Sequence, residues 1–186
     1  MLTDFDIRKK LIEKINKENQ GKHYRVIEEL VICDGIGRAD IALANGMLHG
    51  YEIKSDCDTL DRLANQIECY DKTFDKITIV VGKKFANSIQ NYVPKHWGIE
   101  IAYMNRFGNI SIKRIRAPQK NNHISLNNLL DLLWNPEIKS LLKENKIRGY
   151  SKKDRAGLKE LAINGISFKD LRDYTRETLK TRVGWR

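Results

Sequence analysis

The sequence predicts an α/β fold in which a mixed sheet with flanking helices is followed by a helical extension. Three observations predict it: an apolar stripe at helical spacing near the N-terminus, short β-rich runs up to about residue 115, and helical patterns alone after residue 124. The composition changes at 117–124, which we interpret as a linker. We therefore expect an α/β core over residues 1–120 and a basic helical extension over 121–186.

The first helix is expected at 4–18, and a first strand follows at 24–32. Thr3 is in place as the N-cap of the helix, and Asp6 stands three residues later as in a capping box. The apolar stripe is formed by Phe5, Leu11, Ile12 and Ile15.

A β-hairpin is expected over 38–54, and its register decides which side chains meet. A three-residue loop pairs Ile41 with Tyr51 and places Asp40 opposite Glu52. A two-residue turn pairs Asp40 with Tyr51 instead, and it divides the apolar residues between the two faces. We favour the three-residue loop because the apolar set is then buried together.

The remaining core elements are a helix, a buried strand and a second hairpin. Asp58 is expected to cap the helix, which covers about 58–73. The strands are expected at 77–82, 99–104 and 109–115. In the extension, helices are expected at about 125–134, 136–146, 151–164 and 167–181, with capping boxes at Ser151-x-x-Asp154 and Ser167-x-x-Asp170.

The composition excludes several classes of protein. The 186 residues suit one domain with a small appendage, and no apolar run approaches the ~20 residues of a membrane span. The N-terminus lacks the layout of a secretion signal, and the three cysteines form no CxxC pair. We therefore expect a cytoplasmic protein with reduced thiols and no membrane partner.

The charge distribution favours a polyanionic partner. The 34 Lys and Arg residues outnumber the 24 Asp and Glu residues, which gives a formal charge of +10. Nucleic acid is the first candidate for such a partner, and plain solubility is the alternative. Within this basic protein, the stretch 28–61 sums to −6. An acidic pocket in a basic protein suits a metal-dependent nuclease, because carboxylates hold cations while the surrounding surface holds phosphates.

The favoured hairpin register places a candidate metal site at one end of the hairpin. Asp40 and Glu52 supply two carboxylates, and the carbonyl of Ile53 is a natural third ligand for Mg²⁺, for which Mn²⁺ would substitute. Lys54 lies two residues after Glu52 on the same face, where it can orient or deprotonate a water molecule. A salt-bridge ladder on a surface hairpin is the alternative interpretation.

These residues carry a resemblance to a known family. The words RADIA, GYEIKSDxDTLxRL and QxxxY resemble a bacterial and phage branch of the PD-(D/E)xK phosphodiesterase superfamily over about residues 24–82. The resemblance implies a restriction-endonuclease-like core of helix, three-stranded meander, helix and strand. It also implies that Asp40 and Glu52 bind metal and that Lys54 is catalytic. No proline precedes Asp40, which departs from the family name.

The resemblance implies further site residues. The family often adds an upstream acidic ligand, for which Glu29 is the first choice, Glu28 the second and Glu13 the third. Gln66 and Tyr70 share one helix face, and they resemble the QxxxY element, whose glutamine contacts a phosphate or the metal-bound water. The alternatives are a solvated Gln66 and a core Tyr70.

Nucleic-acid contacts are expected from basic side chains in both parts of the chain, together with Tyr70. The expected contacts are Arg62, Lys113, Arg114, Lys152, Lys153 and Arg155. For the extension, a solvated helical cap on the core is an equal alternative.

The function that the sequence predicts is that of an endonuclease, which hydrolyses DNA phosphodiester bonds with a divalent metal. A non-catalytic DNA-binding module on a nuclease scaffold and an RNA endonuclease are the alternatives. A homodimer would suit double-strand cuts, although no dimer face is evident. The preferred DNA structure or sequence, the number of metal ions and the biological pathway are left open.

Overall fold

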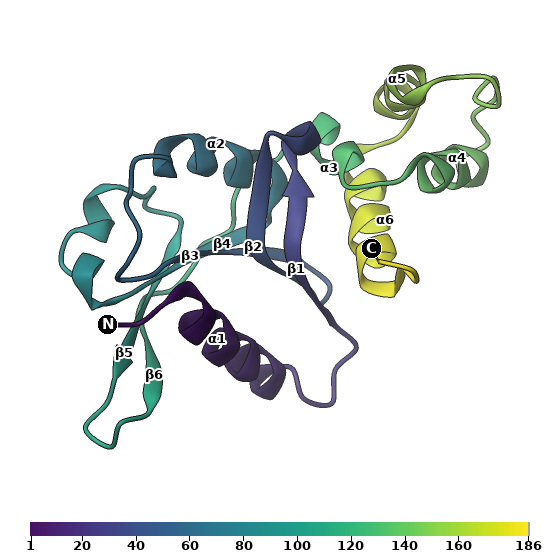
Figure 1. The fold of residues 1–186 in the computed structure, drawn as a ribbon. Coiled ribbons are helices and arrows are strands. Elements are labelled where there is room, and N and C mark those ends of the chain that lie inside the picture. Colours follow the sequence, from purple (N-terminus) through teal and green to yellow (C-terminus); the bar gives the residue numbers. More distant parts are fainter. Residues whose placement is uncertain (186) are drawn as a thin grey trace.

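A computed structural model describes residues 1–185, and its centre is a six-stranded sheet in the order β1-β2-β3-β4-β5-β6 (Figure 1). The pairs β1–β2, β2–β3 and β5–β6 are antiparallel, whereas β3–β4 and β4–β5 are parallel, so the sheet is mixed as expected. The strands are β1 (Arg25–Ile32), β2 (Gly37–Ala44), β3 (Leu48–Lys54), β4 (Lys76–Val81), β5 (Gly98–Met104) and β6 (Ile110–Arg116).

Helix α1 (Asp4–Glu18) covers one face of the sheet. Its N-cap is Thr3, and Asp6 closes the expected capping box. The buried stripe consists of Ile7, Leu11 and Ile15, which are spaced by four residues. Phe5 was wrongly included in that stripe: it falls about a third of a turn away from it, and its side chain is 73% exposed.

The first hairpin adopts the three-residue loop. Ile41 pairs with Tyr51, and the loop closes with a hydrogen bond from the Asn45 N–H to the Met47 carbonyl. The expected apolar set, Ile41, Leu43, Tyr51 and Ile53, lies together in the cluster under α1. The register is therefore confirmed, and its physical reason is that one continuous apolar face can be buried.

Helix α2 (Leu63–Thr73) packs on the opposite face of the sheet. It begins at Leu63, so the expectation that Asp58 caps it is wrong. The carboxylate of Asp58 instead accepts hydrogen bonds from the N–H and hydroxyl of Ser55, which closes a turn before the helix. The capping box predicted at Ser151 is also wrong, because Asp154 caps the next helix there. Ser167 is the N-cap of the last helix and accepts from the Asp170 N–H, but the Asp170 carboxylate accepts from the Ser167 hydroxyl, so the predicted box is only half formed.

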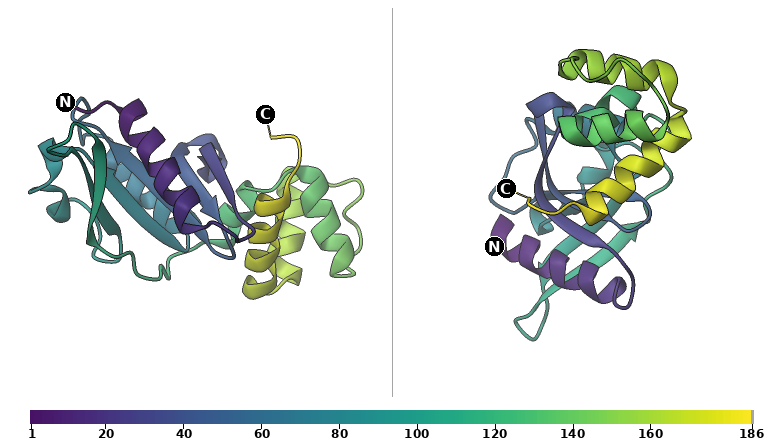
Figure 2. Two further views of the ribbon diagram at one scale, coloured as in Figure 1. Left: turned by 90° about the horizontal axis from the view of Figure 1, so that it is seen from below. Right: turned by 90° about the vertical axis from the view of Figure 1, so that its right-hand side faces the viewer.

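The extension is helical, as expected, and it packs beyond the β1 edge of the sheet (Figures 1 and 2). Its helices are α3 (Leu126–Asp131), α4 (Asn135–Glu144), α5 (Arg155–Gly165) and α6 (Phe168–Thr181). One apolar cluster contains both Ile27 of β1 and Leu179 of α6, so the core is continuous between the sheet and the extension. Within residues 1–185, no helix is long and apolar enough to cross a membrane.

Candidate functional site

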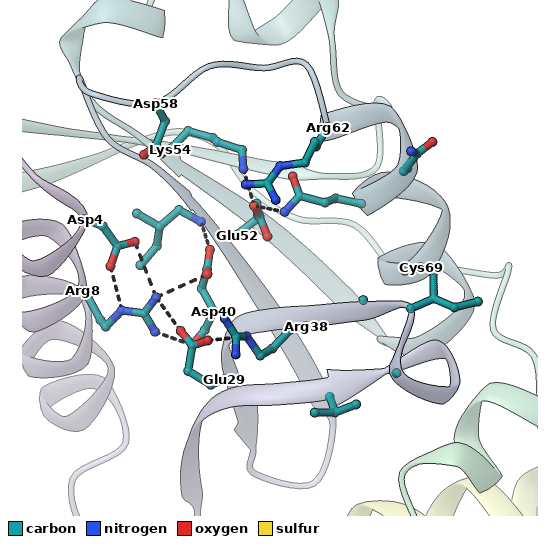
Figure 3. Close-up of a pocket in the computed structure, with 17 residues that line it drawn as sticks. Asp4, Arg8, Glu29, Arg38, Asp40, Glu52, Lys54, Asp58, Arg62 and Cys69 are labelled. Carbon is teal, nitrogen blue, oxygen red and sulfur yellow. Dashed lines mark hydrogen bonds and ion pairs between the residues drawn. The ribbon is translucent and has the colours of Figure 1, made fainter.

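A polar hollow of about 750 Å³ lies between α1, the ends of β2 and β3, and α2 (Figure 3). Its charged lining contains both signs in nearly equal number. The carboxylates are Asp4, Glu29, Asp40, Glu52 and Asp58, and the cations are Arg8, Arg38, Lys54 and Arg62. The structure therefore brings most of the predicted site residues to one place.

The hollow forms where β2 and β3 separate. Their backbone pairing ends at Ile41 and Tyr51, and the next backbone donor of β3 on this side is the Ile53 N–H. The Asp40 carboxylate accepts that hydrogen bond at 2.7 Å, while the Asp40 N–H donates to the Tyr70 hydroxyl at 3.2 Å. The Asp40 carboxylate thus takes the place of a backbone acceptor for the Ile53 N–H. This hydrogen bond holds the Asp40 side chain at the hollow.

Glu52 is buried, and both oxygens of its carboxylate accept hydrogen bonds. Only 1% of the residue is exposed. Its Oε1 accepts from Lys54 Nζ and from Gln66 Nε2, each at 2.7 Å, and its Oε2 accepts from the Tyr70 hydroxyl at 2.6 Å. Lys54 lies two residues after Glu52 and neutralises this carboxylate, so the two charged residues of the Glu-x-Lys motif form an ion pair with each other.

Arg8 closes the other side of the hollow (Figure 3). Its guanidinium contacts Asp4 at 3.0 Å, Glu29 at 2.9 Å and Asp40 at 3.3 Å. It also donates to the backbone carbonyl of Asp40 at 2.8 Å. A resident cation therefore lies beside Asp40, one of the carboxylates from which the sequence predicts a metal site.

The upstream glutamates differ in their surroundings. Glu29 lines the hollow and is bound by Arg8 and Arg38. Its backbone has a φ of 55°, a left-handed conformation that is rare for a residue with a side chain. Glu28 and Glu13 do not line the hollow; Glu13 pairs with Lys10. Of the three candidates, Glu29 is the one that lines the hollow, and Glu28 lies 3.9 Å from Arg8 at its edge.

Burial and neighbouring charge raise the pKa of two groups at the site. Burial, and then the charge of Glu52, raise the pKa of Asp40 to about 7, although the Ile53 N–H and Arg8 act in the opposite direction. Burial, followed by the charges of Glu52 and Asp40, also raises the pKa of Tyr70 well above its usual range. Tyr70 is therefore a neutral hydrogen-bond donor that links the two carboxylate residues.

The structure separates the expected nucleic-acid contacts into two groups. Tyr70 is buried, Arg114 pairs with Glu100, and Arg155 donates to the carbonyls of Leu130, Asp131 and Leu133 at the end of α3. Tyr70 and Arg155 are thus engaged in the fold, whereas Arg114 is paired but exposed, and its contact with nucleic acid stays a prediction. Arg62, Lys113, Lys152 and Lys153 are exposed and take part in no ion pair within residues 1–185.

Sequence reasoning missed Arg8, Asp4 and Arg38 as members of the site. Their sequence signal is weak: Asp4 and Arg8 are an acid and a base four residues apart on a helix, which is a common surface pair. Only the packing of α1 against the sheet turns that pair toward Asp40.

The donor set fits a divalent metal poorly. Over the described part of the chain, no group of three His, Cys, Asp or Glu side chains is placed to hold a metal ion. Both oxygens of Glu52 accept hydrogen bonds, and Asp40 is bound by Ile53 and Arg8. A cation at this place would have to displace Arg8 from Asp40.

The fold and site define an α/β protein with a self-neutralised polar pocket, and sequence comparisons identify its family. The model of the family described as bacteriophage P4 protein cII matches residues 2–185, so the chain belongs to that family. Protein cII of Enterobacteria phage P4 is 29% identical over 182 residues, which cover 98% of this chain and 68% of that protein. No solved structure matches the chain.

This membership corrects the resemblance proposed from the sequence. Assignment to the PD-(D/E)xK superfamily was wrong, and the expectation of an enzyme, a DNA endonuclease or hydrolase, is overturned with it. The physical reason for the error is that an Asp opposite a Glu-x-Lys pair also builds an internal ion-pair network, as Glu52 and Lys54 do here. The phage setting, one of the two expected, is supported by the family.

Proposed function

We propose that this protein binds nucleic acid, DNA in the first place, through the phosphate backbone and without hydrolysing it. The observation that carries the proposal is where the excess positive charge lies. The chain has a formal charge of +10, whereas the hollow holds five carboxylates and four cations, so it contributes none of the positive excess. The excess therefore lies on exposed lysines and arginines outside the hollow.

Such side chains supply salt-sensitive, sequence-independent affinity for phosphates. Arg62 at the rim of the hollow, Lys113 on β6, and Lys152 and Lys153 before α5 are predicted contacts that the fold leaves available. A DNA partner would place the protein in the cytoplasm. A homodimer remains a prediction, for which sedimentation of the free protein is the test.

We also infer a finer description of the core from the order of its elements. Helix α1, the meander β1–β3, helix α2 and strand β4 follow one another in the order of a restriction-endonuclease-like core. In this proposal the scaffold serves for binding alone.

Fluorescence anisotropy with labelled 20-base-pair DNA, single-stranded DNA and duplex RNA tests the proposal. The affinity for DNA should fall by about tenfold or more between 50 and 200 mM salt if several phosphates are contacted. The DNA recovered afterwards should be intact on a denaturing gel, with Mg²⁺ and with EDTA. No binding to any of the three at 50 mM salt would contradict the proposal, and cleaved DNA would contradict its non-hydrolytic form.

A second candidate function is the binding of Mg²⁺, or Mn²⁺ in its place, at Asp40. Burial, and then the charge of Glu52, raise the pKa of Asp40, and a cation that displaced Arg8 would stabilise the charged carboxylate against both. The Ile53 carbonyl, Glu52 and Glu29 are the other ligands expected from the sequence. Melting curves with and without 5 mM Mg²⁺ should show stabilisation of Arg8→Gln and none of Asp40→Asn. Equal melting temperatures for Arg8→Gln in Mg²⁺ and in EDTA would contradict this candidate.

A further inference from the structure

The end of α4 and the loop that joins it to α5 gather basic side chains. Residues 143–153 contain five basic residues and one acidic residue, Glu144. The five are Lys143, Lys146, Arg148, Lys152 and Lys153. All five are exposed, and none of them forms an ion pair within the described residues 1–185. We call this segment the basic loop.

The basic loop has a defined shape. The Ile147 N–H donates to the Leu142 carbonyl at 2.9 Å, and Lys146 has a φ of 58°, so the chain leaves α4 through a left-handed cap. The Ile147 side chain lies against Gly165 of α5, where an added Cβ would approach it to 2.5 Å. The loop is thus fastened to both helices, which reduces the entropy lost when it binds a partner.

A hollow of about 390 Å³ lies within the basic loop, and Lys143, Lys146 and Arg148 line it. Lys152 and Lys153 follow it directly in the chain. The N-terminus of α5 does not supply the positive charge, because the Asp154 side chain already caps it through the Gly157 N–H. The positive charge of this surface therefore comes from side chains alone.

We propose that the basic loop is a contact surface for the phosphate backbone of double-stranded DNA. The inference rests on the proposed function and assigns it to a particular surface that includes Lys143, Lys146 and Arg148. Proteins that bind single strands add aromatic platforms on which bases stack. The single aromatic residue of the loop, Tyr150, is half-buried, so phosphates of a duplex are the groups that this surface recognises.

Two variants with the same loss of charge test the assignment. The loop variant carries Lys143→Gln, Lys146→Gln and Arg148→Gln. The control variant carries Lys9→Gln, Lys17→Gln and Lys22→Gln, which are exposed and lie on or just after α1, whereas the basic loop joins α4 to α5 (Figure 1). Binding to labelled duplex DNA is measured from 50 to 200 mM salt.

The loop variant should bind at least about tenfold more weakly at 100 mM salt. The slope of log affinity against log salt should fall by about 2 to 3, because each lost phosphate contact removes about 0.9. The control variant should stay within about threefold of the wild type, with its slope unchanged. An equal loss in both variants, or none in the loop variant, would overturn the inference and leave the proposed function intact.

A wild-type protein that binds no DNA would overturn both proposals. Should the loop variant melt at a lower temperature than the control, the double variant Lys152→Gln, Lys153→Gln replaces it, because these residues precede α5 and carry no capping role. That variant should lower the slope by about 2, and an unchanged slope would contradict the assignment. Single-stranded DNA of the same length should lose less affinity than the duplex in either loop variant.

Discussion

The polar hollow beside α1 and the basic loop between α4 and α5 are both rich in charge. Charged side chains pair with one another in the hollow, whereas those of the loop are exposed to solvent. In the hollow, Arg8 and Lys54 pair with carboxylates of the same chain, and Glu52 is almost completely buried. In the basic loop, the lysines are exposed to solvent and form no ion pair with any residue of 1–185. Sequence counts of charge therefore do not indicate which charge is available to a ligand.

The difference has an energetic consequence. Charges in the hollow are desolvated, so each of them depends on its partner for stability. Charges in the loop stay hydrated, so their removal costs the fold little. Substitutions should therefore act on stability in the hollow and on binding in the loop.

The largest effect is expected for Glu52→Ala. It leaves the Lys54 ammonium, the Gln66 amide and the Tyr70 hydroxyl without their common acceptor. The free energy of unfolding should fall by about 3–5 kcal/mol, which urea denaturation measures. A loss below about 1 kcal/mol would contradict the role of Glu52 as the common acceptor of these three donors.

A smaller effect is expected from the titration of Asp40. Burial raises the pKa of this group from 3.8 to about 7, so the folded state binds its proton more tightly than the unfolded state does. Its contribution to stability is full below pH 4 and is lost as the pH rises to about 7. Asp40→Asn should remove this loss.

The free energy of unfolding of Asp40→Asn minus that of the wild type should therefore increase by roughly 1–3 kcal/mol between pH 4 and pH 7. The difference is the quantity to measure, because burial lowers the pKa of His49 to about 3, and this group changes stability with the opposite sign. A difference that does not change with pH would show that Asp40 titrates normally.

Arg8→Gln should destabilise the protein by about 1–2 kcal/mol at pH 7, because it removes the cation that joins Asp4, Glu29 and Asp40. The pKa of Asp40 should rise further in this variant. Lys10→Gln is the control, since Lys10 pairs with Glu13, an exposed residue of the same helix. Urea denaturation of the two variants should separate them.

The smallest effect on stability is expected in the basic loop. The Lys152→Gln, Lys153→Gln variant should unfold at the same urea concentration as the wild type, because both side chains are solvated. A marked shift of the midpoint would show that the loop charges support the fold, and the contrast with the hollow would be lost.

Local patterns in the sequence were sufficient for much of the fold. The Thr3 and Ser167 caps, the three-residue hairpin loop and the mixed sheet follow from interactions within a few residues or from the burial of one apolar face. The same reasoning placed Asp40, Glu52 and Lys54 together, whereas Gln66 was added to the site only through the resemblance to a nuclease family. It misplaced the start of α2, because the Asp58 carboxylate has a nearer donor in Ser55.

The chemistry of the hollow could not be predicted in this way. Spacing shows that Asp40 and Glu52 meet, but not that Tyr70 and Lys54 donate to Glu52. A resemblance of short sequence motifs predicted a class of enzyme, and the family comparison over residues 2–185 contradicts that prediction. A comparison over the whole chain tests many more positions than a few motifs do.

The sequence by itself determined the elements, their order, the hairpin register and the excess of positive charge. Only the tertiary structure decided which charges are neutralised, because that depends on contacts between segments far apart in the chain. Arg8 meets Asp40 across 32 positions, and Arg155 meets the end of α3 across more than 20. Such pairings follow from how helices pack on a sheet, which no local spacing encodes.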